Sequence, residues 1–266
     1  MNVTEEYLAK SGQMVKHIGN QATEIKKVAK LFAASILKGR MVHLFGSGHS
    51  RMLVEEMWPR YGSFPGFNPI VELSLSFHNL VVGANGQRQA MFLENVPGLA
   101  SRILRNFDVQ KEDTALVVSS SGCNVVPIEM AQEFQKKGIK VVALISKEHL
   151  EGSSSKKTDG KKLTDFADHI LDTGAPLGDA MIYLKGLDTP VAPGSTLGGV
   201  MLINCIKAEV AQILHQNGKS PKVLSSGKIV GDARAVELFE AAYDEHAHLM
   251  AKLYENVGPK NGRNEI

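Results

Sequence analysis

Two short turns rich in glycine and serine each follow an apolar run and have the composition of an anion-binding site. The first reads Gly-Ser-Gly-His-Ser at residues 46–50, and the second reads Ser-Ser-Ser-Gly-Cys-Asn at residues 119–124. A helix that begins at such a turn offers free N–H groups and the positive end of its dipole, and serine hydroxyls add donors without adding charge. Two such turns in one chain predict a single pocket for a phosphorylated small molecule.

The side chains expected to contact this molecule come from both turns and from a third segment. The third segment, at residues 194–199, opens a predicted helix with a serine and a threonine that either cap the helix or reach the pocket. The alternative for the two turns is that they only cap helices and bind no ligand, because serine and asparagine favour helix caps. The predicted ligand-binding residues are Ser47, His49, Ser50, Ser119, Ser120, Ser121, Asn124, Ser195 and Thr196.

Two glutamates within apolar stretches are candidate proton-transfer groups. Glu56 lies in the sequence VEEMW at residues 54–58, and Glu94 lies in MFLEN at residues 91–95. A carboxyl group in an apolar setting tends to have a raised pKa, which suits proton transfer. For Glu56 the alternative is an ion pair with Arg60 at the i+4 position, and for Glu94 it is an exposed position on an amphipathic helix.

The sequence predicts neither a metal nor a cofactor. None of the nine histidines forms a pair with metal-binding spacing, although His78 is a weaker candidate for ligand contact. The turn at residues 46–50 lacks the third glycine of a dinucleotide-binding fingerprint and the lysine of a Walker loop. Cys123 follows the three serines at a predicted helix start, where a thiol pKa is often lowered, but no base stands beside it. We interpret Cys123 as a small residue that fits the turn.

The elements that position these groups alternate between strand and helix, which predicts an α/β fold with a doubly wound parallel sheet. Ligands bind at the carboxyl ends of such strands, where both turns would lie. We expect one domain over residues 1–266, with the helices 5–37 and 232–255 as extensions. The other predicted helices are 49–58, 86–106 with a division at Pro97, 124–137 and 195–216. The predicted strands are 41–45, 114–118, 139–145 and 169–172, with less regular ones at 69–73 and 179–184.

The composition is that of an ordinary globular protein. The chain has 266 residues, of which 43% are hydrophobic, and its formal net charge is +2 with no long basic block, which argues against nucleic-acid binding. No signal-peptide core and no uninterrupted apolar run of membrane-span length is visible, so we expect no membrane partner. Two cysteines without metal-like spacing favour a cytoplasmic protein with free thiols.

These motifs resemble the SIS (sugar isomerase) domain family. The resemblance covers residues 5–255 and implies phosphosugar binding in a flavodoxin-like fold with five parallel strands. Residues 119–124 resemble the family's phosphate loop, S-x-S-G-x-[T/S/N], and residues 46–50 resemble the glycine-rich turn of phosphoheptose isomerases. The chain as a whole is most similar to uncharacterised phosphoheptose isomerase-like proteins of this family.

The same resemblance implies roles for the glutamates. Residues 55–61 resemble the segment E-E-L-T-G-R-Y of the isomerases, whose second glutamate is catalytic and corresponds to Glu56. Residues 93–95 resemble the second acidic segment of N-acetylmuramic acid 6-phosphate etherases, and residues 193–196 resemble their Gly-Thr turn. Two features depart from the relatives: the segment from Ser50 to Glu56 is about one helical turn shorter, and their late catalytic histidine has no match.

The function implied is a sugar-phosphate isomerase or an etherase-like lyase. Glu56 would remove the proton beside the carbonyl of a phosphorylated sugar or amino sugar, and Glu94 would return a proton or assist a leaving group. The alternative is a phosphosugar-sensing regulatory module, which needs the serine turns but neither glutamate. The family implies a homodimer or homotetramer, and apolar residues on more than one face of the helix 5–37 agree with a partner surface.

Overall fold

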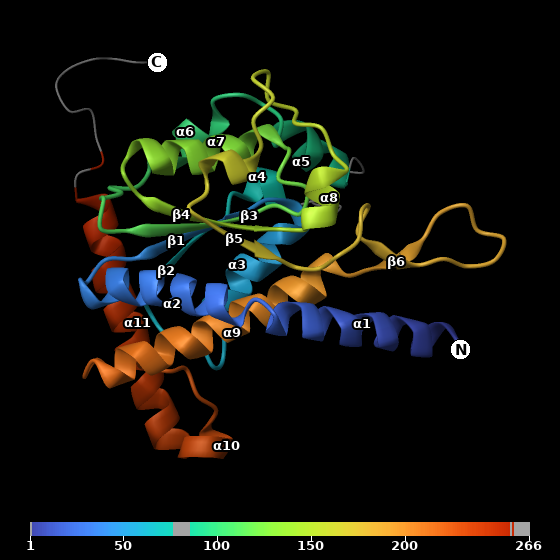
Figure 1. The fold of residues 1–266 in the computed structure, drawn as a ribbon. Helices are drawn as coiled ribbons and strands as arrows, with labels where there is room; N and C mark the ends of the chain where they lie inside the picture. The colour runs from blue at the N-terminus through green and yellow to red at the C-terminus, as the bar shows by residue number, and fades with distance from the viewer. Residues whose placement is uncertain (1, 77–85, 256, 258–266) are drawn as a thin grey trace.

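Five parallel strands form the central sheet of the protein (Figure 1). The computed structural model describes residues 2–76, 86–255 and 257. The strand order β2-β1-β3-β4-β5 confirms the predicted doubly wound α/β architecture. In register, Val42 of β1 pairs with Phe67 of β2 on one side and with Thr114 of β3 on the other. The strands are β1 (Val42–Gly46), β2 (Phe67–Ile70), β3 (Thr114–Val118), β4 (Lys140–Ile145) and β5 (His169–Asp172).

Both faces of the sheet are covered by helices, so the central strands are apolar throughout. Every residue of β1 and β3 is buried. Alternate side chains enter different cores: Leu116 and Val118 of β3 belong to one, and Ala115 and Val117 belong to the other. The first core is formed with α2 (Ala22–Leu37), α3 (Arg51–Met57) and α9 (Ser195–Gln216). The second is formed with α6 (Leu99–Leu104) and α7 (Val125–Lys136).

Helix α9 is long and crosses beneath the sheet in Figure 1. In the described part of the chain it is the one helix whose length and apolar composition would suffice to cross a membrane. Its apolar side chains, among them Leu202, Ile206 and Val210, are packed into the first core. Gly198 brings the helix close to the end of β5, because a Cβ there would lie 2.2 Å from the carbonyl oxygen of Thr173.

The predicted helix 5–37 is two helices, α1 (Val3–Gly19) and α2, and this corrects the sequence-based boundary. Gln21 stands at the break and pairs with β5 through its side chain. Its Nε2 donates to the carbonyl oxygen of Asp172 at 2.7 Å, and its Oε1 accepts the N–H of Asp172 at 2.8 Å. This pairing connects residues about 150 positions apart, so local periodicity did not indicate it.

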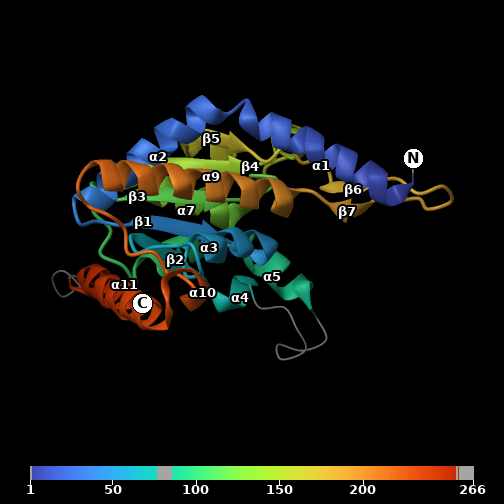
Figure 2. The ribbon, with the colours of Figure 1, turned by 90° about the horizontal axis from the view of Figure 1, so that it is seen from below.

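The predicted strand at 179–184 lies outside the parallel sheet. It forms β6 (Ala180–Ile182), which pairs antiparallel with β7 (Val191–Pro193). Both views show this hairpin and α1 extending together beyond the sheet (Figures 1 and 2). Lys10 Nζ donates to the carbonyl oxygen of Met181 at 2.6 Å, and the hydroxyl of Tyr7 donates to that of Pro193 at 3.1 Å. The fifth strand of the sheet is instead β2, which begins two residues before and ends three residues before the predicted strand 69–73.

The remaining elements are short helical segments and one long C-terminal helix. The predicted division of 86–106 at Pro97 is confirmed, since α5 ends before it and α6 begins after it. The C-terminal helix packs Leu249 and Leu253 against Met41, at the entry to β1. These elements are the 3₁₀ segments η1 (Gly48–Ser50) and η3 (Leu163–Phe166), and the helices α4 (Leu73–Ser76), α5 (Gln87–Leu93), α8 (Lys147–Glu151), α10 (Gly227–Val230) and α11 (Asp232–Tyr254).

Candidate functional site

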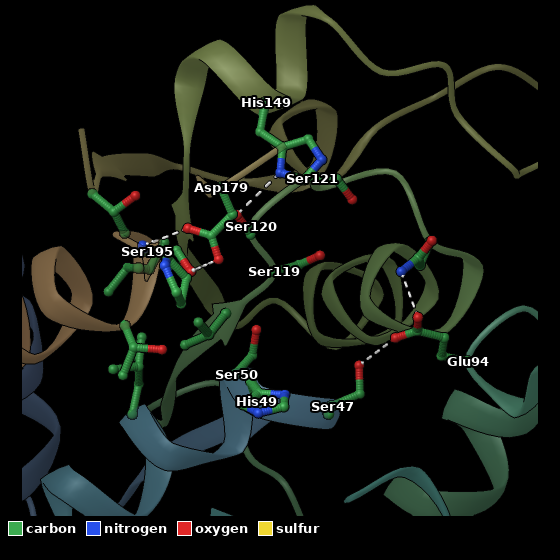
Figure 3. A pocket seen from close by; sticks show the side chains of 18 of the residues that line it. Ser47, His49, Ser50, Glu94, Ser119, Ser120, Ser121, His149, Asp179 and Ser195 are labelled. Carbon is green, nitrogen blue, oxygen red and sulfur yellow. Dashed lines mark hydrogen bonds between the residues drawn. The ribbon is translucent and has the colours of Figure 1, made fainter. Parts of the chain in front are cut away.

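A cavity of about 380 Å³ lies at the carboxyl ends of the strands, between the two serine turns (Figure 3). Both turns reach it because they follow β1 and β3, which are neighbours in the sheet. The predicted residues that line it are Ser47, His49, Ser50, Glu94, Ser119, Ser120, Ser121, Asn124, Ser195 and Thr196. It is also lined by Gly48, Leu53, Gln87, Val118, Leu144, His149, Thr173, Asp179 and Pro193. Glu56 is not among the described residues that line it.

The first turn is tight, and its glycines make it so. A Cβ on Gly46 would lie 2.7 Å from the carbonyl oxygen of Ser50, which no real side chain tolerates. Gly48 has a φ of +55°, a backbone conformation that favours glycine. The N–H of Ser50 donates to the carbonyl oxygen of Ser47 at 3.1 Å and closes the turn. The chain therefore turns directly from β1 into η1 with Ser47, His49 and Ser50 at the cavity wall.

The second turn presents hydroxyl groups with protons to donate. Ser119 Oγ accepts the N–H of Gly122 at 3.2 Å, and Ser121 Oγ accepts the N–H of Cys123 at 3.3 Å. Because each oxygen acts as an acceptor toward the backbone, its own proton is left for another partner. Asn124 occupies the N-cap position of α7, yet its side chain makes no capping hydrogen bond. The purely structural interpretation of Asn124 as a helix cap therefore does not hold.

Glu94 connects the two turns. Its Oε2 accepts the hydroxyl proton of Ser47 at 2.8 Å, and its Oε1 accepts from Asn124 Nδ2 at 2.8 Å. Its carbonyl oxygen also accepts the N–H of Val126, in the first turn of α7, at 2.9 Å. Burial raises the pKa of Glu94, and it outweighs the hydrogen bonds from Ser47 and Asn124 and the nearby charge of Lys156, all of which lower it. The residue is half-buried, so the alternative of an exposed surface position does not hold.

Glu56 is carried by α3 but lines a cavity other than the serine-lined one. It lines a second cavity, of about 540 Å³, together with Arg60 and aromatic residues of α11. Although burial raises its pKa, the hydrogen bond that Asn204 Nδ2 donates to Oε1 at 2.7 Å and the ion pair with Arg60 outweigh this and lower it. The predicted ion pair with Arg60 is confirmed, and the geometry separates Glu56 from the serine turns.

Ser195 is turned toward an aspartate rather than toward the centre of the cavity. Its hydroxyl donates to Asp179 Oδ2 at 2.8 Å, and its N–H donates to Asp179 Oδ1 at 2.6 Å. The N–H of Gly194 donates to the same Oδ1 at 3.1 Å. A carboxylate thus already satisfies the first N–H groups of α9 and the positive end of its dipole. Of the two long helices that start at this cavity, α7 is the one whose N-terminus faces serine hydroxyls instead.

Four residues whose polar side chains line the cavity were not predicted from the sequence: Gln87, His149, Thr173 and Asp179. His149 Nδ1 lies 3.3 Å from Ser120 Oγ, as Figure 3 shows. A usable signal existed for His149 and Thr173, because each follows the carboxyl end of a predicted strand, the edge where the turns meet. Asp179 is harder to predict from the sequence, because it lies in a Gly-rich loop whose path depends on the hairpin of β6 and β7.

The structure gives no chemical role to Cys123 and shows no metal site among the described residues. Burial raises the pKa of the Cys123 thiol, although Lys162 and Lys156 act to lower it, so the thiol of this helix start is not activated. Within residues 2–76 and 86–255, no group of three or more His, Cys, Asp or Glu side chains has the arrangement of a metal site. His78 lies outside the described residues.

Comparison with known proteins identifies a family for this chain. Residues 6–146 match the model of the SIS domain. A UPF0309 protein of Thermoanaerobacter pseudethanolicus is 34% identical over 233 residues, which cover 85% of this chain and 91% of that protein. A UPF0309 protein of Listeria innocua is 31% identical over 247 residues, which cover 93% of each chain.

Solved structures share the fold at low sequence identity. A phosphoheptose isomerase from Francisella tularensis superposes with a TM-score of 0.53 at 13% identity, covering 80% of this chain and 100% of that one. The Vibrio vulnificus NanR protein complexed with ManNAc-6P superposes with a TM-score of 0.50 at 12% identity, covering 91% of this chain and 69% of that one.

Proposed function

Because the chain belongs to the SIS domain family, we propose that its serine cavity binds the phosphate of a phosphorylated sugar or amino sugar. The observation that carries this proposal is the convergence of two serine turns, from neighbouring strands, on one cavity. The hydroxyl protons of Ser119 and Ser121 are available to phosphoryl oxygens, and both groups stand at the N-terminus of α7. Donors and helix dipole together favour an anion at this point.

In the enzymatic form of the proposal, Glu94 transfers the proton that isomerisation or β-elimination requires. Its raised pKa brings the carboxyl group closer to neutral pH, where a general base or acid is most effective. The hydrogen bonds from Ser47 and Asn124 hold both oxygens in place at the cavity wall. A group positioned in this way typically accelerates a reaction by about 10²- to 10⁴-fold. Glu56 has no part in this step, since its carboxylate is held by Arg60 and Asn204 outside the cavity.

One observation favours a second candidate, a phosphosugar sensor. The cavity contains only one of the two predicted catalytic glutamates among its described lining residues. A sensor needs the serine turns and a conformational response but no base. The NanR structure contains ManNAc-6P, and we include binding of a phosphorylated amino sugar by this chain in the sensor proposal.

The binding proposal is tested by calorimetric titration with a panel of sugar phosphates, such as glucosamine 6-phosphate, N-acetylmannosamine 6-phosphate and sedoheptulose 7-phosphate. We expect at least one to bind, and Ser119→Ala and Ser121→Ala each to weaken it by about tenfold, the value of one hydrogen bond to a charged group. Ser101→Ala is the matched control, because Ser101 is exposed on α6, away from the cavity. Equal binding by all three variants would contradict the proposal.

Deuterium exchange distinguishes the enzyme from the sensor. A sugar phosphate that binds is incubated with the protein in D₂O, and exchange of the proton beside the carbonyl is followed by NMR. An enzyme exchanges it, and Glu94→Gln stops the exchange while retaining binding. Binding without exchange for every ligand of the panel would support the sensor.

A further inference from the structure

His149 is held directly against the serine turn, although the predicted site did not include it. Its Nδ1 lies 3.3 Å from the hydroxyl oxygen of Ser120, the middle serine of the three. The imidazole lies over this turn, on the α8 side of the cavity, while Glu94 stands at the opposite wall near Ser47 (Figure 3). The ring therefore adds a wall to the phosphate turn that the two Gly/Ser segments alone do not supply.

The helix that carries His149 is anchored to the turn by its first residues. Ser146 is fully buried and caps α8, its Oγ accepting the N–H of His149 at 3.2 Å. The N–H of Ser146 donates to the carbonyl oxygen of Ser120 at 2.9 Å, and its hydroxyl donates to that of Ala175 at 2.6 Å. The position of the imidazole is thus coupled to the serine turn through both the backbone and the side chain of Ser120.

Gly122 of the serine turn packs against α8, and its positive φ is what favours a glycine there. A Cβ on Gly122 would lie 2.7 Å from Leu150 Cδ1, and Gly122 has a φ of +61°. Leu150 is the residue after His149, so this contact places α8 directly beside the serine turn. His149 is therefore positioned by the fold and is not a surface side chain that happens to be near.

The charged groups that line the cavity indicate that a phosphate ligand needs further hydrogen-bond donors, which the imidazole of His149 can supply. The described lining residues include the carboxyl groups of Glu94 and Asp179 and no lysine or arginine. A phosphate monoester brings about −1.5 to −2 charges at pH 7. Neutral N–H and O–H donors of the described lining must therefore hold this charge, and the imidazole of His149, 3.3 Å from Ser120 Oγ, stands beside the hydroxyls of the serine turn.

Three charged groups near α8, Lys162, Glu148 and Asp179, are engaged elsewhere. Lys162 Nζ donates to the carbonyl oxygen of Leu150 at 2.6 Å, and Glu148 Oε2 accepts the N–H of Leu177 at 3.2 Å. Asp179 is occupied by the N-terminus of α9. None of these contacts competes with His149 for a ligand at the serine turn.

We propose that His149 is a binding residue for the phosphoryl group, an inference that rests on the proposed function. In the proposed arrangement, the hydroxyl of Ser120 donates to Nδ1, which leaves the ring proton on Nε2, and this N–H donates to a phosphoryl oxygen. The serine turn and α7 hold the phosphate from one side, and the imidazole holds it from the other. Ser120 is a positioning residue, because it selects the nitrogen that carries the proton.

The test is calorimetric titration of the tightest-binding sugar phosphate, and of inorganic phosphate, with wild type, His149→Leu and His149→Gln. The Leu variant removes the Nε2–H donor, and we expect affinity for both ligands to fall by about tenfold or more. The Gln variant keeps an N–H donor and recovers part of the loss. His248→Leu, at an exposed histidine on α11, is the matched control and leaves both affinities unchanged.

The outcomes separate the two proposals. If no sugar phosphate binds the wild type, the proposed function is overturned; if the wild type binds and His149→Leu binds equally well, only the role of His149 is overturned. Should the Leu variant not fold, NMR of the wild type decides. The imidazole nitrogen resonances of His149, assigned through the backbone, shift on saturation with the sugar phosphate if the ring contacts it. Unchanged resonances would overturn the inference.

Discussion

Glu94 and Glu56 occupy equivalent-looking stretches of sequence but opposite electrostatic environments. Both lie among apolar residues on or beside short helices. Glu94 receives hydrogen bonds from two neutral side chains and stands at the wall of the serine cavity, where burial raises its pKa. Glu56 pairs with Arg60 and Asn204, which lower its pKa despite burial.

The difference shows that the partners of a carboxyl group, and not its local sequence, determine what it can do. Arg60 neutralises the charge of Glu56 and stabilises the ionised form. Ser47 and Asn124 orient Glu94 without neutralising it, which leaves the group able to gain or lose a proton near the cavity. We therefore propose a role in proton transfer for Glu94 and a role in structural stabilisation for Glu56.

The largest expected effect is on turnover. For any sugar phosphate that the protein transforms, we expect Glu94→Gln to lower kcat by about 10²- to 10⁴-fold, because a positioned proton-transfer group is lost. Glu56→Gln is the matched substitution and changes kcat by less than about threefold in our account. Steady-state kinetics of the two variants measures both. A larger loss from Glu56→Gln than from Glu94→Gln would reverse the comparison.

The next effect is on stability in the Glu56 region. Lys207 is 5% exposed, and its Nζ donates to the carbonyl oxygen of Glu56, in the last turn of α3, at 2.7 Å. We expect Lys207→Ala to lower the free energy of unfolding by about 2 kcal/mol, because it removes this donor and buried methylene groups. Urea denaturation measures the loss. The exposed Lys38→Ala is the control, and similar stability of the two variants would argue against a structural role for this region.

The smallest effect is a pair of opposite pH dependences. Glu94 has a raised pKa in the folded state, so the folded protein binds its proton more tightly, and its contribution to stability falls as pH rises from about 4.5 through the folded pKa. Glu56 has a lowered pKa, so its contribution is present above about 4.5 and is lost as pH falls through the folded pKa.

Denaturation curves from pH 3 to 8 test these signs. Relative to wild type, Glu94→Gln gains stability as pH rises above about 4.5, and Glu56→Gln loses stability as pH rises toward about 4.5. Changes of the same sign in the two variants would show that their environments do not differ as described.

The sequence indicated the serine cavity because its chemistry is local. Each turn combines glycine and serine directly after an apolar strand, and neighbouring parallel strands bring such turns together at one edge. Glu94 was also predicted as a candidate, because it is an acidic residue within an apolar stretch. Its position between Ser47 and Asn124 depends on how α5 returns to the sheet, which periodicity alone does not specify.

Contacts between distant segments explain what the sequence did not indicate. Glu56 is turned away from the cavity by Asn204, 148 positions later. The long N-terminal helix breaks where Gln21 pairs with Asp172. His149 and Asp179 join the cavity because the segments after β4 and β5 fold back over the same sheet edge, and no motif marks either residue.

Our central claim, that the serine cavity and not the cavity beside Glu56 binds a sugar phosphate, is tested most directly by mapping ligand-induced shifts of backbone amide resonances. We predict that saturation with a sugar phosphate shifts the amides of residues 46–50 and 119–124, together with that of His149, and leaves those of Tyr61, Phe239 and Tyr243 in place. Shifts confined to Tyr61, Phe239 and Tyr243, with both serine turns unchanged, would contradict it.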